Sequence, residues 1–187
     1  MIDLEHDHGV AVVRIHENPD FEMHCGTMVP ETLDRITAAL AYIGGSHAVV
    51  LTGGDDVFAR GFAGGGAADR LERAVLAIAH HPSPVVAALG GDALGAGYAL
   101  AAAADLRVMS AGRLGLGAGA QVAPAVEAVL QRHAGPVWRT VRSGERTFTP
   151  EAALVAGLVE TCCAPADLLT VAVARAARLA GGAKQFC

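Results

Sequence analysis

Short apolar runs alternate along this chain with segments of helical periodicity. Three runs have the length and the apolar content of strands buried within a sheet, namely Ala48–Thr52, Val85–Leu89 and Leu106–Met109. Strands buried on both faces belong to parallel sheets, in which a helix commonly connects one strand to the next. The alternation therefore predicts the α/β class, and because no long linker divides the chain we expect a single domain over residues 1–187.

Apolar residues at helical spacing mark the segments between and after these runs. In the clearest case, Leu33, Ile36 and Leu40 form one stripe in a segment that begins at a proline and ends before two glycines. The expected helices span residues 30–43, 95–104, 121–133, 136–142, 150–156 and 165–180. A further helix is expected where Leu71, Val75 and Ile78 form one apolar stripe. The segment 95–104 consists almost entirely of small residues, so we expect it to pack closely on both sides. A core of about residues 1–145 would thus precede a helical C-terminal part of about residues 146–187.

The first residues have the pattern of a β-hairpin. Two short apolar runs, Ile2–Leu4 and Val10–Ile15, lie on either side of the turn-forming residues Asp7-His8-Gly9. Asn18-Pro19-Asp20 is expected to end the second strand.

The charge balance points to a small molecule as the ligand. The chain carries a formal net charge of -5 and no cluster of lysine and arginine, which argues against nucleic acid or an anionic membrane as the partner. No apolar stretch has the length of a membrane span, and the first residues do not resemble a signal peptide, so we expect a cytoplasmic protein. Four cysteines lack the spacing of a metal site or a disulfide scaffold and are expected to be free thiols: Cys25, Cys162, Cys163 and Cys187.

Two glycine-rich segments, Gly61–Gly66 and Gly90–Gly97, are expected to be loops that follow strands and lead into helices. The first backbone N–H groups of a helix lack an acceptor within the helix, and glycine lets a ligand approach them closely. Tight turns with close helix packing would explain either segment alone. Two such segments after neighbouring parallel strands can instead converge on one ligand oxygen.

Four motifs in order resemble those of the crotonase (enoyl-CoA hydratase/isomerase) superfamily, over nearly the whole chain. Residues 49–63 are similar to the strand, Thr-Gly turn and Phe-x-x-Gly-Ala-Asp loop that form the first half of the family's oxyanion hole. Residues 84–97, continuing to the Ala104-Asp105-Leu106-Arg107 segment, resemble the second half. Arg132-His133-Ala134-Gly135 and residues 149–159 resemble two further family segments downstream.

This resemblance implies a spiral of repeated ββα units that binds an acyl-thioester, usually of coenzyme A. The thioester carbonyl would be polarised between the backbone N–H groups of Phe62 and Ala96, which would stabilise an enolate. No cofactor is implied beyond the coenzyme A of the substrate, and family relatives suggest a homotrimer or a higher oligomer. The substrate-binding positions that the resemblance implies are Gly61, Ala63, Gly95, Gly97, Ala99, Ala118 and His24.

The chain departs from the family pattern at the two positions where hydratases carry catalytic glutamates. Both positions hold alanine, Ala99 and Ala118, and an alanine cannot transfer a proton. The helical C-terminal region is also shorter than is usual in the family. Two functions therefore stay open: an enzyme of the lyase, isomerase or hydrolase type that uses other residues, or a non-catalytic acyl-thioester binder or partner subunit.

Asp92 is the candidate acid or base, because it lies in the second glycine-rich segment where family members carry an apolar or aromatic residue. Facing the acyl group, its carboxyl would have a raised pKa and could transfer a proton; facing outward, it would only form a turn. Weaker candidates for the site are His24, His133, Tyr98 and Glu127.

Two other patterns suggest cofactors and are better explained by structure. Residues 115–120 satisfy the GxGxxA form of the dinucleotide fingerprint, but the nearest acid, Glu145, comes late, so glycine packing is the preferred interpretation. The histidines His6/His8, His80/His81 and the His24-Cys25 pair lack a second ligand pair at metal-site spacing. They are expected to be solvated or capping residues.

Overall fold

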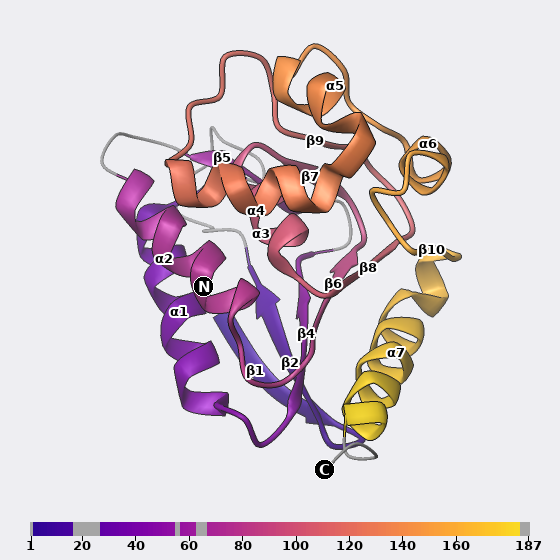
Figure 1. The fold of residues 1–187 in the computed structure, drawn as a ribbon. Helices are drawn as coiled ribbons and strands as arrows, with labels where there is room; N and C mark the ends of the chain where they lie inside the picture. Colours follow the sequence, from indigo (N-terminus) through magenta and orange to yellow (C-terminus); the bar gives the residue numbers. More distant parts are fainter. Residues whose placement is uncertain (1, 17–26, 55–56, 63–66, 184–187) are drawn as a thin grey trace.

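Two sheets form the frame of the computed structural model, which describes residues 2–16, 27–54, 57–62 and 67–183 (Figure 1). The larger sheet has the order β1 (Ile2–Asp7), β2 (Val10–Ile15), β4 (Ala48–Thr52), β6 (Val85–Leu89), β8 (Leu106–Met109) and β10 (Thr161–Cys162). The smaller sheet has the order β3 (Thr27–Met28), β5 (Val57–Phe62), β7 (Asp92–Leu94) and β9 (Leu114–Gly115). The helices are α1 (Pro30–Ile43), α2 (Ala68–Ala79), α3 (Ala96–Ala103), α4 (Pro124–Ala134), α5 (Trp138–Ser143), α6 (Pro150–Val155) and α7 (Leu168–Ala183).

The larger sheet is parallel except at its first strand, as the buried apolar runs predicted. β1 and β2 form the expected antiparallel hairpin, and His8 and Gly9 both have positive φ, which matches the twist of a two-residue hairpin turn. The pairs β2·β4, β4·β6, β6·β8 and β8·β10 are all parallel. Every residue of β4 and of β6 is buried, so both faces of the sheet are covered.

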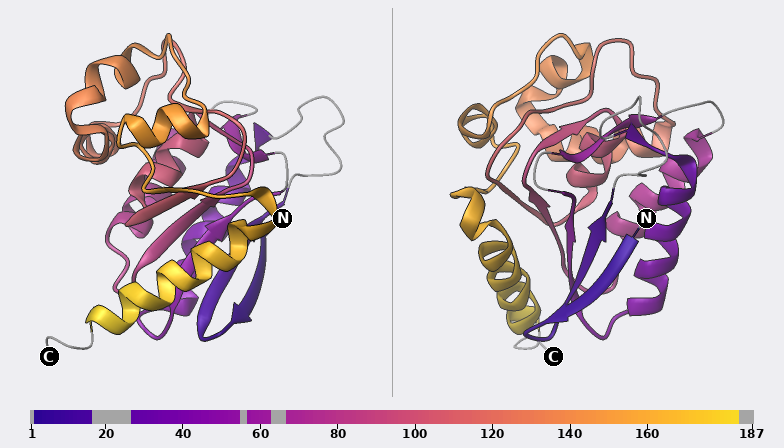
Figure 2. Two further views of the ribbon diagram at one scale, coloured as in Figure 1. Left: turned by 90° about the vertical axis from the view of Figure 1, so that its right-hand side faces the viewer. Right: turned by 180° about the vertical axis from the view of Figure 1, so that it is seen from behind.

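Different helices cover the two faces of the larger sheet (Figure 2). Ala48 and Val50 of β4 pack in a cluster with Ala172 and Ala176 of α7. Residues that alternate with them along the strand, such as Leu51, belong to the core shared with α1, α2 and α3. The period-two alternation of a strand thus separates two apolar cores, one on each face.

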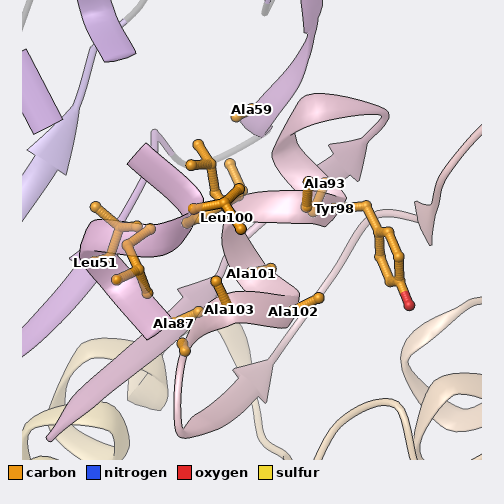
Figure 3. Packing of buried hydrophobic residues seen from close by; sticks show 14 of the residues in the cluster. Leu51, Ala59, Ala87, Ala93, Tyr98, Leu100, Ala101, Ala102 and Ala103 are labelled. Atoms are coloured by element: carbon orange, nitrogen blue, oxygen red, sulfur yellow. The ribbon is translucent and has the colours of Figure 1, made fainter. Parts of the chain in front are cut away.

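Helix α3 is enclosed on all sides, as its small residues predicted. All eight of its residues are buried. Figure 3 shows its alanines close to Leu51 and Ala87, while Tyr98 points away from them on the other side of the helix. Alanine side chains allow this close approach because they add little bulk beyond the backbone.

The smaller sheet corrects the prediction that both glycine-rich segments are loops. β5 continues through Gly61 to Phe62, and β7 spans Asp92–Leu94, so part of each segment is strand. These strands are short, and the β5·β7 register is irregular between Val57 and Ala59, so they lack the alternation by which strands are found in a sequence. Asn18-Pro19-Asp20, which was expected to end β2, lies outside the described residues.

None of the helices within the described ranges combines the length and the apolar character needed to cross a bilayer.

Candidate functional site

The end of β5 and the start of α3 meet through glycine contacts. Gly95 has a φ of +59°, and a Cβ added to it would lie 3.5 Å from the Cα atom of Gly61. A Cβ at Gly97 would lie 2.0 Å from the carbonyl oxygen of Ala59, so no side chain fits there. The two glycine-rich segments therefore converge, as the sequence predicted.

The two predicted backbone donors flank this contact. Ala96 is the first residue of α3, where a backbone N–H has no acceptor within the helix, and Phe62 is the last residue of β5. Gly95 N donates to the carbonyl oxygen of Gly115 at 2.9 Å, which ties the start of α3 to β9. That both donors bind one carbonyl oxygen stays a prediction.

The two positions that the family resemblance matches to the hydratase glutamates carry only methyl groups. Ala99 is fully buried in the first turns of α3, and its N–H donates to the carbonyl oxygen of Gly95 at 3.1 Å. Ala118 is exposed in the turn after β9. Two other predicted site residues, His24 and Ala63, lie outside the described residues.

Asp92 lies in strand β7, so its interpretation as a turn former is wrong. Its Oδ2 atom accepts a hydrogen bond from Nη2 of Arg60 at 2.8 Å, and its Oδ1 atom accepts one from the backbone N–H of Arg113 at 2.9 Å. Both carboxylate oxygens are therefore engaged by donors. Its role as an acid or base stays a prediction.

Arg60 is the residue of this region that the sequence analysis did not single out. It lies in β5 between Ala59 and Gly61, and its guanidinium pairs with Asp92. The available signal was two charges of opposite sign, one in each of the two segments that resemble the halves of the family's oxyanion hole. A single charge in either segment is typical of a solvent-exposed side chain, and only the contact between Arg60 and Asp92 shows that the two residues interact.

Tyr98 and His133 lie together between α3 and α4. Their ring centroids are 6.0 Å apart, and neither Tyr98 Oη nor His133 Nε2 has a hydrogen-bond partner among the described residues, although both atoms are buried. Burial raises the pKa of Tyr98 well above its usual value of 10. Burial and the nearby charge of Arg107 lower the pKa of His133 to about 3. Both side chains are therefore neutral at neutral pH.

Two charged residues near these helices are already paired. Glu127, a weaker sequence candidate, accepts a hydrogen bond from Nε of Arg142 at 3.0 Å at the surface. Arg107 is buried, pairs with Glu160 and donates from Nη1 to the carbonyl oxygen of Ala104 at 2.7 Å. These contacts connect α4 to α5 and β8 to the segment before β10.

The glycines of residues 115–120 fit the predicted packing only in part. A Cβ on Gly115 would lie 3.3 Å from the carbonyl oxygen of Arg146, whereas one on Gly117 or Gly119 would meet no atom within 4 Å, so backbone conformation explains these two. Gly117 and Gly119 have positive φ, and a Cβ added to Gly144 would lie 2.0 Å from the carbonyl oxygen of Gly117. The next helix, α4, begins only at Pro124, whereas a dinucleotide fingerprint leads directly into its helix. Within the part of the chain that the structure describes, no three His, Cys, Asp or Glu residues are grouped closely enough to hold a metal ion, and Cys162 and Cys163 are free thiols.

Along the chain, a strand of the larger sheet is twice followed by a strand of the smaller sheet and then by a helix, as in β4–β5–α2 and β6–β7–α3. This arrangement defines an α/β protein of crotonase-like fold. Its sequence matches the family model described as enoyl-CoA hydratase/isomerase over residues 5–187, so the chain belongs to that family. It is 34% identical over 201 residues to a protein of Mycobacterium tuberculosis (strain H37Rv) described as probable enoyl-CoA hydratase EchA17. That match covers 96% of this chain and 74% of the relative.

Solved structures agree with this assignment. PA4980 of Pseudomonas aeruginosa superposes with a TM-score of 0.81 at 25% identity, over 96% of this chain and 84% of its own. A structure described as a monofunctional enoyl CoA isomerase from M. smegmatis gives a TM-score of 0.78 at 25% identity, over 95% of this chain and 84% of that one.

Proposed function

We propose that this protein binds an acyl-thioester, with coenzyme A as the carrier, and stabilises an enolate formed next to the thioester carbonyl. The donors in this proposal are the backbone N–H groups of Phe62 and Ala96. The contact between Gly61 and Gly95 carries the proposal, because it brings together the two residues that follow these glycines. Family membership supports it, as do relatives described as an enoyl-CoA hydratase and an enoyl CoA isomerase.

Backbone donors of this kind act on the charge that develops on the carbonyl oxygen. Removing one such donor typically costs about 2.7 to 4 kcal/mol of transition-state stabilisation. The hydrogen bond comes from the main chain, so the side chains at Phe62 and Ala96 are not required for it. The neighbouring glycines matter more, because a side chain at Gly97 would push α3 away from Ala59.

The proposed activity excludes ordinary hydration of an enoyl-thioester. Hydratases of the family activate water with two glutamates, and Ala99 and Ala118 replace them here. General acid–base catalysis contributes roughly a hundred- to ten-thousandfold where it operates. An enzyme of this fold would therefore need another ionisable group near the acyl carbons.

A second candidate function is binding without catalysis. The complete burial of Ala99 among apolar residues of α3 favours it, because the position offers neither a proton-transferring group nor contact with solvent. In this case the backbone donors would hold the thioester carbonyl of a ligand that leaves unchanged.

A crystal soaked with a non-hydrolysable acyl-CoA analogue tests both candidates. The proposal expects the oxygen that replaces the thioester carbonyl to lie about 2.7–3.1 Å from both backbone nitrogens. A ligand bound elsewhere, or no bound ligand at saturating concentration, would contradict it. An ionisable side chain within hydrogen-bond reach of the acyl carbons would favour the enzyme, and its absence would favour the binder.

A further inference from the structure

Three consecutive residues of β5 contact the start of α3 and the segment that leads into it. Ala59 lies against Gly97, and Gly61 lies against Gly95. Between them, Arg60 reaches Asp92 at the start of β7. The glycine contacts are van der Waals contacts, whereas the contact at Arg60 is a hydrogen-bonded ion pair.

The ion pair joins the first β7 residue of the ladder between β5 and β7, Asp92, to a β5 residue just beyond its last pair, Arg60. Val57 pairs with Asp92 and Ala59 with Ala93, with an irregular register between these pairs. Among the described residues the ladder goes no further than Ala59 along β5. The position of Gly61 and Phe62 relative to α3 therefore depends on the close contact between Gly61 and Gly95 and on the ion pair of Arg60, rather than on backbone hydrogen bonds to β7. On its other edge this part of β5 pairs with β3.

Asp92 also contacts the residue that precedes β9, the fourth strand of this sheet. Its Oδ1 atom accepts from the backbone N–H of Arg113, while the N–H of Ala93 donates to the carbonyl oxygen of Arg113 at 2.8 Å. Asp92 is thus anchored to the chain entering β9, and it offers its second oxygen to Arg60 from a fixed position. Its side chain is 21% exposed, so the pair is partly shielded from water.

We propose that the Arg60–Asp92 ion pair is a positioning device that sets the distance between the two backbone donors, Phe62 and Ala96. Phe62 follows Arg60 by two residues, and Ala96 follows Asp92 by four, so a shift of either partner moves its donor. This inference rests on the proposed acyl-thioester site. It assigns Asp92 to the geometry of the site and makes no use of it as an acid or base.

The test uses the full chain and butyryl-CoA labelled with carbon-13 at the thioester carbonyl. Polarisation by two donors moves the carbonyl resonance downfield on binding, and this shift reports on the donors rather than on overall stability. The variants are Asp92→Asn, which keeps the acceptor for Arg113 and removes the charge, Arg60→Met, and the two combined. Glu31→Gln is the matched control, because it removes a surface ion pair with Arg70 between α1 and α2.

We expect each single variant to lose half or more of the downfield shift and to bind up to about fivefold more weakly. The double variant should be no worse than the poorer single one, because both changes break the same contact. Arg60→Lys should recover part of the shift, and Glu31→Gln should match the wild type. These comparisons are made on variants whose circular dichroism is that of the wild type.

Three results would overturn the inference. Wild-type shift and affinity in both single variants would show that the pair does not position the donors. Additive losses in the double variant would show that Arg60 and Asp92 act separately. Wild-type protein that binds butyryl-CoA with no downfield shift, or does not bind it, would instead remove the proposed acyl-thioester site and this inference with it.

Discussion

At the scale of single residues, two buried polar atoms without hydrogen-bond partners lower the stability of the folded protein. Tyr98 Oη and His133 Nε2 are both buried and unpartnered, and Tyr98 is the largest fully buried side chain of the described residues. A buried group without a hydrogen bond typically costs about 1–3 kcal/mol. The cost stays small because both side chains are neutral. Protonation of His133 would add a buried charge, so the stability of the protein depends on the protonation state of this residue.

The lowered pKa of His133 predicts that the protein loses stability as the pH falls. Its pKa is lowered to about 3 in the folded protein, against an ordinary value of 6.5. Between these values the unfolded chain binds a proton that the folded chain does not, so the free energy of unfolding should fall with decreasing pH. The contribution is at most about 1.4 kcal/mol per pH unit.

Urea unfolding between pH 7 and pH 5 measures this effect before most carboxylates titrate. His133→Leu should show a shallower pH dependence than the wild type, and His80→Gln, at an exposed histidine, is the control. Equal slopes for the wild type and His133→Leu would contradict the prediction.

Alanine at the two positions that the family resemblance matches to the hydratase glutamates predicts negligible hydration of crotonyl-CoA. Turnover should lie far below the about 1–1000 per second typical of enzymes, because neither Ala99 nor Ala118 can activate water. Loss of the enoyl-thioester ultraviolet absorbance measures this directly. Turnover in the typical range would show that other residues supply the acid and base.

At the scale of elements, close backbone contact is what places α3. Gly97 packs on the carbonyl of Ala59, and Gly95 packs on Gly61, so the helix lies directly against β5. Ion pairs and ladders then hold the smaller sheet together around this contact. The proposed donors therefore depend on the separation between one helix and one strand.

Gly97→Ala should disturb this separation. The added Cβ would lie 2.0 Å from the carbonyl oxygen of Ala59, so α3 or β5 must shift, at a cost of typically about 1–3 kcal/mol of stability. Binding of an acyl-CoA analogue should weaken as well, since Ala96 moves with the helix. Thermal unfolding and calorimetric titration measure the two effects.

Gly181→Ala is the matched control, because a Cβ there meets no atom within 4 Å in helix α7. It should stabilise the protein by about 0.5–1 kcal/mol through helix propensity and leave binding unchanged. Unchanged stability and binding in Gly97→Ala would show that the helix and strand can separate at no cost.

At the scale of the whole molecule, the surface of α6 is the most apolar exposed feature among the described helices. Val155 is 91% exposed and Leu154 is 44% exposed, although both are large and apolar. Exposed apolar side chains that lie together often mark association surfaces. This observation supports the expected self-association of the chain, which stays a prediction, as does the single domain.

Light scattering at micromolar concentration tests the prediction. We expect a mass above that of the 19.0 kDa chain, and Val155→Ser combined with Leu154→Ser should lower it. A monomeric wild-type protein would contradict self-association. A multimer that the double substitution leaves intact would place the interface elsewhere.

Local pattern was sufficient to predict the strands of the larger sheet other than β10, together with the helices that pack on them. The strand at 48–52, the strand at 85–89 and the helix at 30–43 were predicted with the bounds that the structure shows. Burial on both faces and a 3.6-residue stripe are properties of neighbouring residues, so they are visible in the sequence. The family motifs added the positions of the proposed donors.

The smaller sheet and the partner of Asp92 were decided only by tertiary structure. Strands such as β7 and β9 are too short for a period to appear, and they are held by neighbours distant in the chain. Asp92 could have formed a turn or faced a ligand on sequence grounds. The folded chain brings Arg60 and the N–H of Arg113 to its two oxygens, and a contact across 32 residues leaves no local pattern.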